Sequence, residues 1–222
     1  MFTIYAFDEV TSTNDVLKQQ YQTYEDHSVI LAHKQTKGRG RFARVWESDD
    51  DLTFSILLKK EYPNDLIAPL SIIYALKQYG IEASIKWPND ILLNGKKLCG
   101  ILIESIYEGN EKVASIIGIG INLSKKPTSL TKAAYLSLPK DELLQKILIQ
   151  YDQLLSAKAS YLISAISQNS YLSGRTILLD GIIWKVDGIE EHGYLRVHHK
   201  ETTRLLKSEE VTLEAVYDKE CL

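Results

Sequence analysis

The sequence is poor in cysteine and has no long apolar run. Its 222 residues include two cysteines, Cys99 and Cys221, which lie far apart. Neither a disulfide framework nor a structural zinc site of paired Cys and His ligands can be built from them. The N-terminus, MFTIYAFDEV, lacks the basic and apolar regions of a secretory signal, and no apolar run is long enough to span a bilayer. We therefore expect a cytoplasmic protein without membrane association.

The chain also lacks an excess of positive charge. It has 26 Lys and Arg against 29 Asp and Glu, a net charge of -3, whereas a general nucleic-acid binder has a basic surplus. Hydrophobic residues make up 45% and charged residues 25% of the chain, which is typical of globular proteins with a proper core. The length suits one large domain, or one domain with a small appendage.

Several common catalytic signatures are absent. The sequence contains no GxSxG elbow, no HExxH, no GxxxxGK[ST] phosphate loop and no cysteine with a well-placed histidine. The GxG formed by Gly118 and Gly120 lacks the third glycine of a dinucleotide fingerprint, and no helix visibly follows it. These absences leave no credible pair of nucleophile and base.

The most unusual segment is residues 37–46, KGRGRFARVW, which we call the Gly-Arg loop. It contains four cations around two glycines and ends in an aromatic and aliphatic group that includes Trp46. Arginine forks match phosphate and carboxylate oxygens two at a time, and glycine lets the backbone approach a ligand closely. We interpret the segment as a flexible loop that becomes ordered over an anion. The alternative is an ordinary solvated basic loop.

Two strands and a helix are expected before this loop. Residues 3–7 and 28–33 alternate as strands, and the second leads through Gln35 into the loop. Residues 14–21 have helical periodicity after three residues of the N-cap type, Thr11, Ser12 and Thr13. Ser12, Thr13 and Asn14 either cap this helix or face a polar ligand at the junction of strand and helix, and the two interpretations are compatible.

A β-hairpin is the clearest prediction of the central part of the chain. Asn94-Gly95 between two apolar runs is a strong hairpin signal, so residues 91–93 and 97–104 should pair as antiparallel strands. Near one end of this hairpin we expect four polar residues to converge: Lys86, Asn89, Asp90 and Lys97. The alternative is a surface hairpin with ordinary lysines.

The remaining elements complete the expected domain. We predict an acidic turn at 47–51, a strand at 52–58, a helix at 65–79, a turn at 108–111, a strand at 113–123, a polar-to-apolar connection at 128–138 and a long amphipathic helix at 141–168. After residue 173 the period changes from helical to alternating. Short strands are expected at 176–179, 182–186, 194–199, 203–206 and 211–213, with tight turns at 180–181, 187–188 and 192–193.

These C-terminal strands predict a small β-barrel, and we divide the chain into domains at 1–172 and 173–222. His198-His199 lies on one of the strands, and we expect no metal role for it.

The chemistry that these residues allow is nucleotidyl transfer. The expected site offers cations, amides, small hydroxyls and one acid, Asp90. Positioning and charge stabilisation account for most of the catalysis of phosphoryl transfer. A carboxylate that attacks the α-phosphate of ATP needs no base, because it is ionised at pH 7, but its charge and that of the phosphate must be offset. Mg²⁺ would contribute to this.

Four segments occur in the order and spacing of biotin–protein ligases: Ser12-Thr13-Asn14, GRGRFARVW, KWPNDILLNGKKLCGILIE and GIGINL. The chain resembles this family over most of residues 3–123, in the short form without an N-terminal helix-turn-helix domain. The resemblance implies an α+β fold with a mixed, largely antiparallel central sheet and flanking helices, like class II synthetases and the biotin–lipoate ligase catalytic domain. A small C-terminal SH3-like β-barrel would follow, although this part is similar only in size, position and turn pattern.

The implied enzyme is a biotin–[acetyl-CoA-carboxylase] ligase, which is ATP-dependent and AMP-forming. Biotin and ATP would give biotinyl-5′-AMP and pyrophosphate, and biotin would then pass to a lysine of a biotin carboxyl carrier protein. The loop would close over the adenylate, because a mixed anhydride hydrolyses readily. We expect no DNA binding, and the oligomeric state, monomer or homodimer, stays open.

The resemblance also assigns site residues by matching position. Biotin would be bound by Ser12, Thr13, Asn14, Gln35, Gly38, Arg39, Gly40, Arg41 and Lys97. ATP would be bound by Arg41, Arg44, Trp46, Lys86, Asn89, Asp90 and Asn122. The catalytic residues would be Lys97, Arg39, Arg41 and Asp90. Asp90 is also the candidate ligand of Mg²⁺ and the candidate to orient or deprotonate the carrier lysine.

Two segments depart from the family pattern. Ala43 stands where the family usually has glycine, which costs free energy if the position needs a positive φ. Residues 47–51 are acidic where the family usually has a proline and a glycine, and this affects expectations about loop movement. Two rival functions stay open: a lipoate or octanoate ligase or transferase, which would have a longer apolar acyl tunnel, and a non-catalytic module that binds biotin or a nucleotide.

Overall fold

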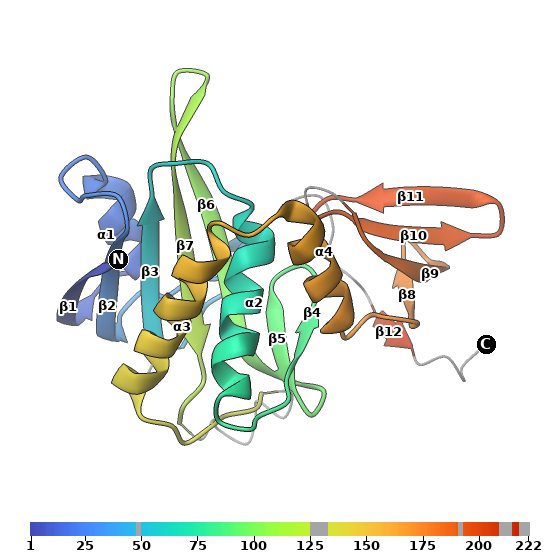
Figure 1. The fold of residues 1–222 in the computed structure, drawn as a ribbon, viewed down its shortest axis with the longest axis horizontal. Coiled ribbons are helices and arrows are strands. Elements are labelled where there is room, and N and C mark those ends of the chain that lie inside the picture. Colours follow the sequence, from blue (N-terminus) through green and yellow to red (C-terminus); the bar gives the residue numbers. More distant parts are fainter. Residues whose placement is uncertain (48–49, 125–132, 191–192, 209–214, 218–222) are drawn as a thin grey trace.

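The computed structural model describes residues 1–47, 50–124, 133–190, 193–208 and 215–217. Its larger sheet has seven strands in the order β1-β2-β3-β7-β6-β5-β4 (Figure 1). These strands are β1 (Thr3–Val10), β2 (Ser28–Gln35), β3 (Leu52–Leu58), β4 (Ser84–Lys86), β5 (Asp90–Leu93), β6 (Lys96–Glu108) and β7 (Glu111–Ile121). Only β1 and β2 are parallel, so the sheet is mixed and largely antiparallel, which confirms the predicted fold class.

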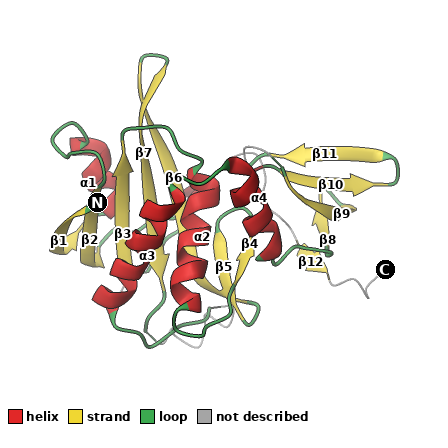
Figure 2. Cartoon of the chain, viewed as in Figure 1, coloured by secondary structure: helices red, strands yellow, loops and turns green. Residues whose placement is uncertain are grey.

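Helices cover both faces of this sheet. They are α1 (Thr13–Gln20), α2 (Asn64–Lys77), α3 (Lys140–Leu154) and α4 (Ala159–Gln168). Side chains of a strand alternate between its faces, and neighbours on β2 accordingly belong to different cores. Val29 packs in the core with α2 and α3, whereas Ile30 packs under α1. Figure 2 shows α2 and α3 lying side by side over the same face of the sheet.

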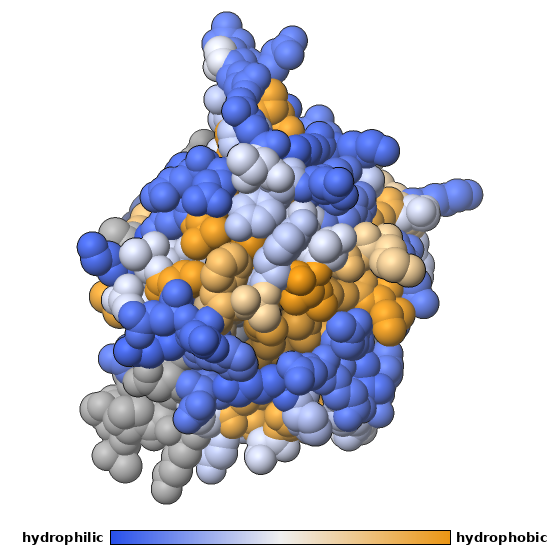
Figure 3. Space-filling view, turned by 90° about the vertical axis from the view of Figure 1, so that its left-hand side faces the viewer, coloured by the Kyte–Doolittle hydropathy of each residue, from blue (hydrophilic) through white to orange (hydrophobic). Residues whose placement is uncertain are grey.

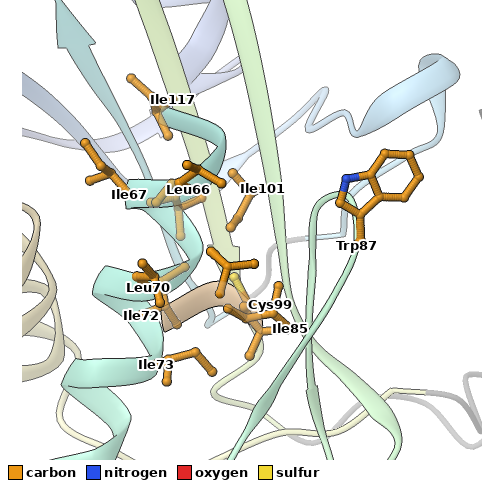
Figure 4. Packing of buried hydrophobic residues seen from close by; sticks show 14 of the residues in the cluster. Leu66, Ile67, Leu70, Ile72, Ile73, Ile85, Trp87, Cys99, Ile101 and Ile117 are labelled. Carbon is orange, nitrogen blue, oxygen red and sulfur yellow. The ribbon is translucent and has the colours of Figure 1, made fainter. Parts of the chain in front are cut away.

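The core under α2 explains why the central strands are apolar. Leu66, Ile67 and Leu70 of α2 belong to one buried cluster with Cys99 and Ile117 of β6 and β7 (Figure 4). Because both faces are covered, every residue of β3 is buried, and the strand lacks the alternation of a half-exposed strand. The β3 boundaries that we predicted agree with the structure.

The predicted hairpin is confirmed. Asn94 and Gly95 have φ of 51° and 74°, as the tight two-residue turn requires, and β5 pairs antiparallel with β6. The turn after Glu108 is also confirmed, with Gly109 at φ 61°. Beyond the body of the sheet, β6 and β7 continue as a protruding hairpin (Figure 1).

A second, smaller sheet follows α4. It has five strands in the order β11-β10-β9-β8-β12, and all pairs are antiparallel. The strands are β8 (Thr176–Leu179), β9 (Ile182–Ile189), β10 (Leu195–His199), β11 (Thr202–Leu206) and β12 (Ala215–Tyr217). We call this the C-terminal sheet. Its size and pairing fit an SH3-like unit, but the prediction of a barrel was wrong for the described residues, because β11 and β12 are edges that do not pair with each other.

The C-terminal sheet shares its core with the larger sheet. Leu172, Ile177 and Trp184 belong to the same buried cluster as α2 and β6. The indole Nε1 of Trp87, after β4, donates to the Gly193 carbonyl at 2.9 Å. The two sheets are therefore joined by buried contacts, and the domain boundary after residue 172 stays a prediction.

Two further predictions need correction. The long helix at 141–168 is two helices, because the chain turns after Leu154 and Lys158 is extended, with φ -67° and ψ 142°; apolar spacing alone does not show such a change of direction. Asp187-Gly188 is not a turn. It lies inside β9 at a β-bulge opposite β10, where Gly188 has φ 155°, a value that glycine tolerates.

Some predictions fall on residues outside the described part. The strand at 211–213 is one, and His192, residues 48–49 and residues 128–132 are others. At the end of the acidic segment, Asp51 is 1% exposed and accepts from the backbone N–H of Leu123 at 2.9 Å. This residue therefore fixes the end of β7 and is not part of a solvated turn.

The β1 edge forms one side of the molecule. Figure 3 looks onto that side, where an apolar area is bordered by polar residues, and Tyr5 and Phe7 of β1 are 37% and 36% exposed. In the described part of the chain, no helix is both long and apolar enough to cross a membrane.

Candidate active site

A cavity of about 430 Å³ opens on the face of the larger sheet that carries α1. Every site residue predicted from the sequence lines it, with the exception of Gly38. These are Ser12, Thr13, Asn14, Gln35, Arg39, Gly40, Arg41, Arg44, Trp46, Lys86, Asn89, Asp90, Lys97 and Asn122. Residues that are up to 110 positions apart (Ser12 and Asn122) thus share one cavity.

The strand register explains the floor of the cavity. Ser55 of β3 pairs with Gly118 of β7, which pairs with Leu102 of β6. Two residues further along β7, and so on the same face, Gly120 pairs with Gly100. Directly opposed residues of antiparallel strands lie on the same face, so these three glycines leave a shallow depression on the face that carries α1.

Other side chains fill this depression. A Cβ added at Gly118 would overlap the amide of Asn14 and lie 3.0 Å from its Cγ. A Cβ added at Gly120 would overlap the indole of Trp46 and lie 2.6 Å from its Cζ2. The GxG that we excluded as a nucleotide fingerprint therefore has another physical reason, the close approach of two side chains to the sheet.

One end of the cavity holds a buried polar network, formed by Thr13, Asn14, Gln35 and Ser55. The backbone N–H of Thr13 donates to Gln35 Oε1 at 2.8 Å, and Ser55 Oγ lies 2.6 Å from Thr13 Oγ1 and 2.5 Å from Asn14 Oδ1. Ser12 caps α1 by accepting from the N–H of Asp15 at 3.5 Å. Both interpretations of this segment are thus compatible with the structure: Ser12 caps, and its neighbours face the cavity.

The other end of the cavity holds cations. Lys97 Nζ lies 2.7 Å from Asp90 Oδ1 and 5.5 Å from the centre of the Trp46 ring. Lys86 lies opposite Asp90 in the register of β4 and β5. Arg41 donates to Asn89 Oδ1 at 3.3 Å. The convergence predicted for the hairpin residues is therefore present.

Asn122 stabilises the backbone at this end of the cavity. Its side-chain amide donates to the backbone carbonyls of Lys97 at 3.2 Å and Ala134 at 2.9 Å. It is 5% exposed. In this structure the amide group holds the chain that carries Lys97.

The Gly-Arg loop is hydrogen-bonded in this structure. Trp46 N–H donates to the Gly38 carbonyl at 2.9 Å, and Gly40 N–H donates to the Arg44 carbonyl at 2.7 Å. Between them lies a short 3-10 turn, η1 (Arg41–Ala43), in which Phe42 has a positive φ of 55°. A Cβ at Gly38 would overlap the Trp46 carbonyl, so this glycine is needed for the backbone of the loop and does not line the cavity.

Two of the three arginines of this loop, Arg39 and Arg41, have different surroundings. Arg39 donates to both carboxylate oxygens of Glu104, each at 3.1 Å, and also contacts Asp15. Arg41 contacts the carbonyl of Ser208, two residues after the end of β11. The loop is therefore attached at two places, to β6 through Arg39 and to the segment after β11 through Arg41.

Two titratable groups of β6, next to the cavity, have shifted pKa values. Burial raises the pKa of the Glu104 carboxyl, but hydrogen bonds from Asn14 and Arg39 and the positive charge of Arg39 outweigh it, and the net shift is downward. Glu104 is thus ionised at neutral pH. Burial raises the pKa of the Cys99 thiol far above its ordinary value, so this fully buried cysteine is no nucleophile.

The donor set gives a limited fit for a metal ion. No group of three or more His, Cys, Asp or Glu side chains in the described residues could hold one. Asp90 and Glu47 are the acids that line the cavity. Mg²⁺ often binds through one or two carboxylates together with substrate phosphates, so Asp90 fits a magnesium ion that arrives with a nucleotide.

Four residues that shape the site were not predicted from the sequence: Ser55, Glu104, Gly118 and Gly120. Each stands out within a buried strand, a hydroxyl in LTFSILL, a carboxylate in GILIES and two glycines in GIGI. A polar or side-chain-free residue inside an apolar strand was the available signal. What the sequence could not show was the register that places them on one face.

Comparisons with known proteins show which family this chain is similar to. A family model described as the biotin/lipoate A/B protein ligase family matches residues 6–122. The bifunctional ligase/repressor BirA of Bacillus subtilis is 31% identical over 214 residues, a match that covers 84% of this chain and 66% of the relative. The biotin–[acetyl-CoA-carboxylase] ligase of Paracoccus denitrificans is 37% identical over 108 residues, 44% of this chain and 45% of the relative. The matches thus span less than two thirds of these relatives.

Among solved structures, the biotin protein ligase of Aquifex aeolicus in complex with biotin and ATP superposes with a TM-score of 0.82 at 28% identity. The match covers 96% of this chain and 98% of that one.

Proposed function

The chain belongs to the biotin/lipoate A/B protein ligase family, and from this premise we propose that it is a biotin–protein ligase. It activates biotin with ATP to biotinyl-5′-AMP and passes biotin to a lysine of a carrier protein. The observation that carries the proposal is a single cavity with two chemically different ends, a buried network of neutral polar groups and a cluster of cations. The similar Aquifex aeolicus protein was solved with biotin and ATP.

The polar end favours biotin over lipoate or octanoate. Biotin has a urea group, with one acceptor oxygen and two N–H donors, at the end opposite its carboxylate. Thr13, Asn14 and Gln35 line this end with hydroxyl and amide groups, which can exchange hydrogen bonds with a urea but not with a fatty acyl chain. A site lined by hydrogen-bonding groups discriminates against an analogue that lacks them.

The cationic end suits the activation step. An oxygen of the biotin carboxylate forms a bond to the α-phosphorus of ATP, and the bond from that phosphorus to the bridging oxygen breaks, so that pyrophosphate leaves with the electron pair. Lys97 is in contact with both Asp90 and Trp46. It offsets the charge on the carboxylate and phosphoryl oxygens. Arg41 adds a second cation from the loop. Such preorganised charges are the main source of catalysis in this class of reaction.

The surrounding residues bind the nucleotide. Trp46 lies against the glycines of the floor and packs against the adenine side. Arg44, Lys86 and Asn89 line the same part of the cavity and serve the phosphates. Mg²⁺ bound to ATP would contribute positive charge beside Asp90.

In the transfer step, the amine of the carrier lysine attacks the carbonyl carbon of the adenylate. A new amide bond forms, the bond from that carbon to the phosphate oxygen breaks, and AMP leaves. The lysine must lose a proton to react, and we propose that Asp90, which is 24% exposed at the cavity, orients the amine or accepts this proton.

We propose that the acceptor is a biotin carboxyl carrier protein, in line with the name of the Paracoccus denitrificans relative, and that the reaction takes place in the cytoplasm. Residues 1–172 would bind biotin and ATP, and residues 173–222 would form a separate small domain.

Transfer to a carrier tests the proposal. The purified protein is incubated with biotin, ATP, Mg²⁺ and an isolated biotin carboxyl carrier domain, and the mass of that domain is measured. We expect the mass of one biotinyl group, biotin less one water, to be added to the carrier and not to a variant with arginine in place of its acceptor lysine. A lipoyl carrier domain with lipoate or octanoate is run beside it. Modification of the lipoyl domain alone would favour the rival ligase, and modification of neither would favour a binding module.

A further inference from the structure

Arg39 is hydrogen-bonded to two carboxylates, which offset its positive charge and occupy its donors. Its two terminal nitrogens meet both oxygens of Glu104 at 3.1 Å, and one of them also contacts Asp15. Lys18 lies 3.2 Å from the same carboxylate. The cluster contains two cations and two carboxylates, so its formal charge is zero. Lys97 and Arg41, in contrast, lie at the cationic end of the cavity.

Glu104 has a second connection, to the polar end of the cavity. It accepts from Asn14 Nδ2 at 2.8 Å, and Asn14 is also in contact with Ser55 and is confined by Gly118. Glu104 itself is 15% exposed, so its hydrogen bonds are partly shielded from water. One carboxylate on β6 thus holds both a loop residue and a residue of the polar network.

We propose that Glu104 is a positioning residue that couples the Gly-Arg loop to the polar network through Arg39 and Asn14. Arg39 then acts as a fastener of the loop to the sheet and not as a ligand of the phosphate. A fork-to-fork pair with a carboxylate has the geometry for this, because two parallel hydrogen bonds fix orientation as well as distance. This inference rests on the proposed biotin ligase function for its kinetic consequences, but the fastening itself does not.

The matched pair of variants is Glu104→Gln and Glu108→Gln. Both residues are on β6, four positions apart and therefore on the same face. Among the described side chains, Glu108 has its hydrogen bonds with Tyr21 and Gln22 near α1 and none with the loop. Glutamine keeps the size of the side chain and one acceptor, and removes the charge and the second acceptor oxygen that the Arg39 fork requires.

Limited trypsin digestion of the ligand-free protein measures the fastening directly. Trypsin cuts after Lys and Arg, and the loop contains four such sites. In Glu104→Gln we expect cleavage within residues 37–44 to be about 10-fold faster than in wild type, the equivalent of about 1.4 kcal/mol, while Glu108→Gln is cleaved at the wild-type rate. Equal cleavage of the loop in both variants would overturn the proposal, whatever their activity.

Kinetics then distinguish positioning from a general loss of structure. We expect Glu104→Gln to raise the KM for biotin and the rate of biotinyl-AMP escape about 10-fold each, with kcat for pyrophosphate exchange within about 3-fold of wild type. The double variant Arg39→Gln/Glu104→Gln should be affected less than the sum of the two single variants, since both remove the Arg39–Glu104 link. Additive effects, or a loss of kcat without a change in KM, would refute the coupling. Faster loop cleavage in a protein whose wild type shows no exchange would support the fastening while refuting the ligase function.

Discussion

Two glycines on one strand should control the two ends of the cavity separately. Gly118 and Gly120 lie on the same face of β7, and an added Cβ would overlap Asn14 at the first position and Trp46 at the second. Neither glycine has a positive φ, so alanine causes no backbone strain and the effect comes from the collision. We predict that Gly118→Ala impairs biotin binding and Gly120→Ala impairs ATP binding.

The magnitude for Gly118→Ala follows from the contacts of Asn14. Displacing this amide removes its hydrogen bond to the charged Glu104 at 2.8 Å and its contact with Ser55 at 2.5 Å. A bond to a charged group contributes about 1.5–3 kcal/mol and a neutral one about 0.5–1.5 kcal/mol, so losing both should lower the free energy of unfolding by about 2–4.5 kcal/mol. Leaving a polar group of biotin unpaired costs about 1–3 kcal/mol, which weakens biotin binding roughly 10-fold to 100-fold.

Calorimetric titration with biotin and kinetic titration with ATP measure the two effects. The predicted pattern is crossed: a larger Kd for biotin with a nearly unchanged KM for ATP in Gly118→Ala, and the reverse in Gly120→Ala. Chemical denaturation shows whether each variant is folded. Wild-type biotin affinity in Gly118→Ala, or the same change in both variants, would refute the placement of the biotin ring beside Asn14.

Four further outcomes are expected. Lys97→Ala should lose about 2–4 kcal/mol of transition-state stabilisation, by analogy with an oxyanion donor, as measured by kcat/KM for adenylation, while Lys96→Ala stays near wild type. Arg41→Gln should release biotinyl-AMP into solution, which chromatography detects, since this cation attaches the loop to Asn89 and to the Ser208 carbonyl. Because the pKa of Glu104 is lowered in the folded state, the stability it contributes is present at pH 7 and disappears as the pH falls through that lowered pKa. The difference in free energy of unfolding between wild type and Glu104→Gln, measured by chemical denaturation, should therefore shrink as the pH is lowered from 7. Trp87→Phe removes a buried hydrogen bond to the C-terminal sheet and should lower the free energy of unfolding by about 1–3 kcal/mol.

Local signals in the sequence were sufficient for several parts of the fold. Asn94-Gly95 specified its hairpin because few residues other than Asn and Gly adopt the positive φ values of the turn. The apolar run of β3 gave that strand its correct bounds. The break between α3 and α4 was missed, because the apolar spacing continues through the point where the chain changes direction.

The site residues that could be predicted from the sequence are those whose charge alone indicates a role in binding or catalysis. The Gly-Arg loop, Lys97 and Asp90 were identified from charge and spacing, and the structure brings them to one cavity. Glu104 and Ser55 were not identified, because their importance depends on which strands pair and in which register. The same dependence on register explains why the sequence could not assign Arg39 a partner, since Glu104 lies 65 positions away.

The central claim is tested most directly by biotin-dependent exchange of labelled pyrophosphate into ATP. The assay reports formation of the adenylate without any carrier, so it isolates the chemistry attributed to the two ends of the cavity. Exchange that depends on biotin, and is absent with lipoate or octanoate, is the predicted result. Exchange only with lipoate or octanoate would contradict the biotin assignment. No exchange with any of these acids, from folded protein with Mg²⁺ present, would contradict the ligase function itself.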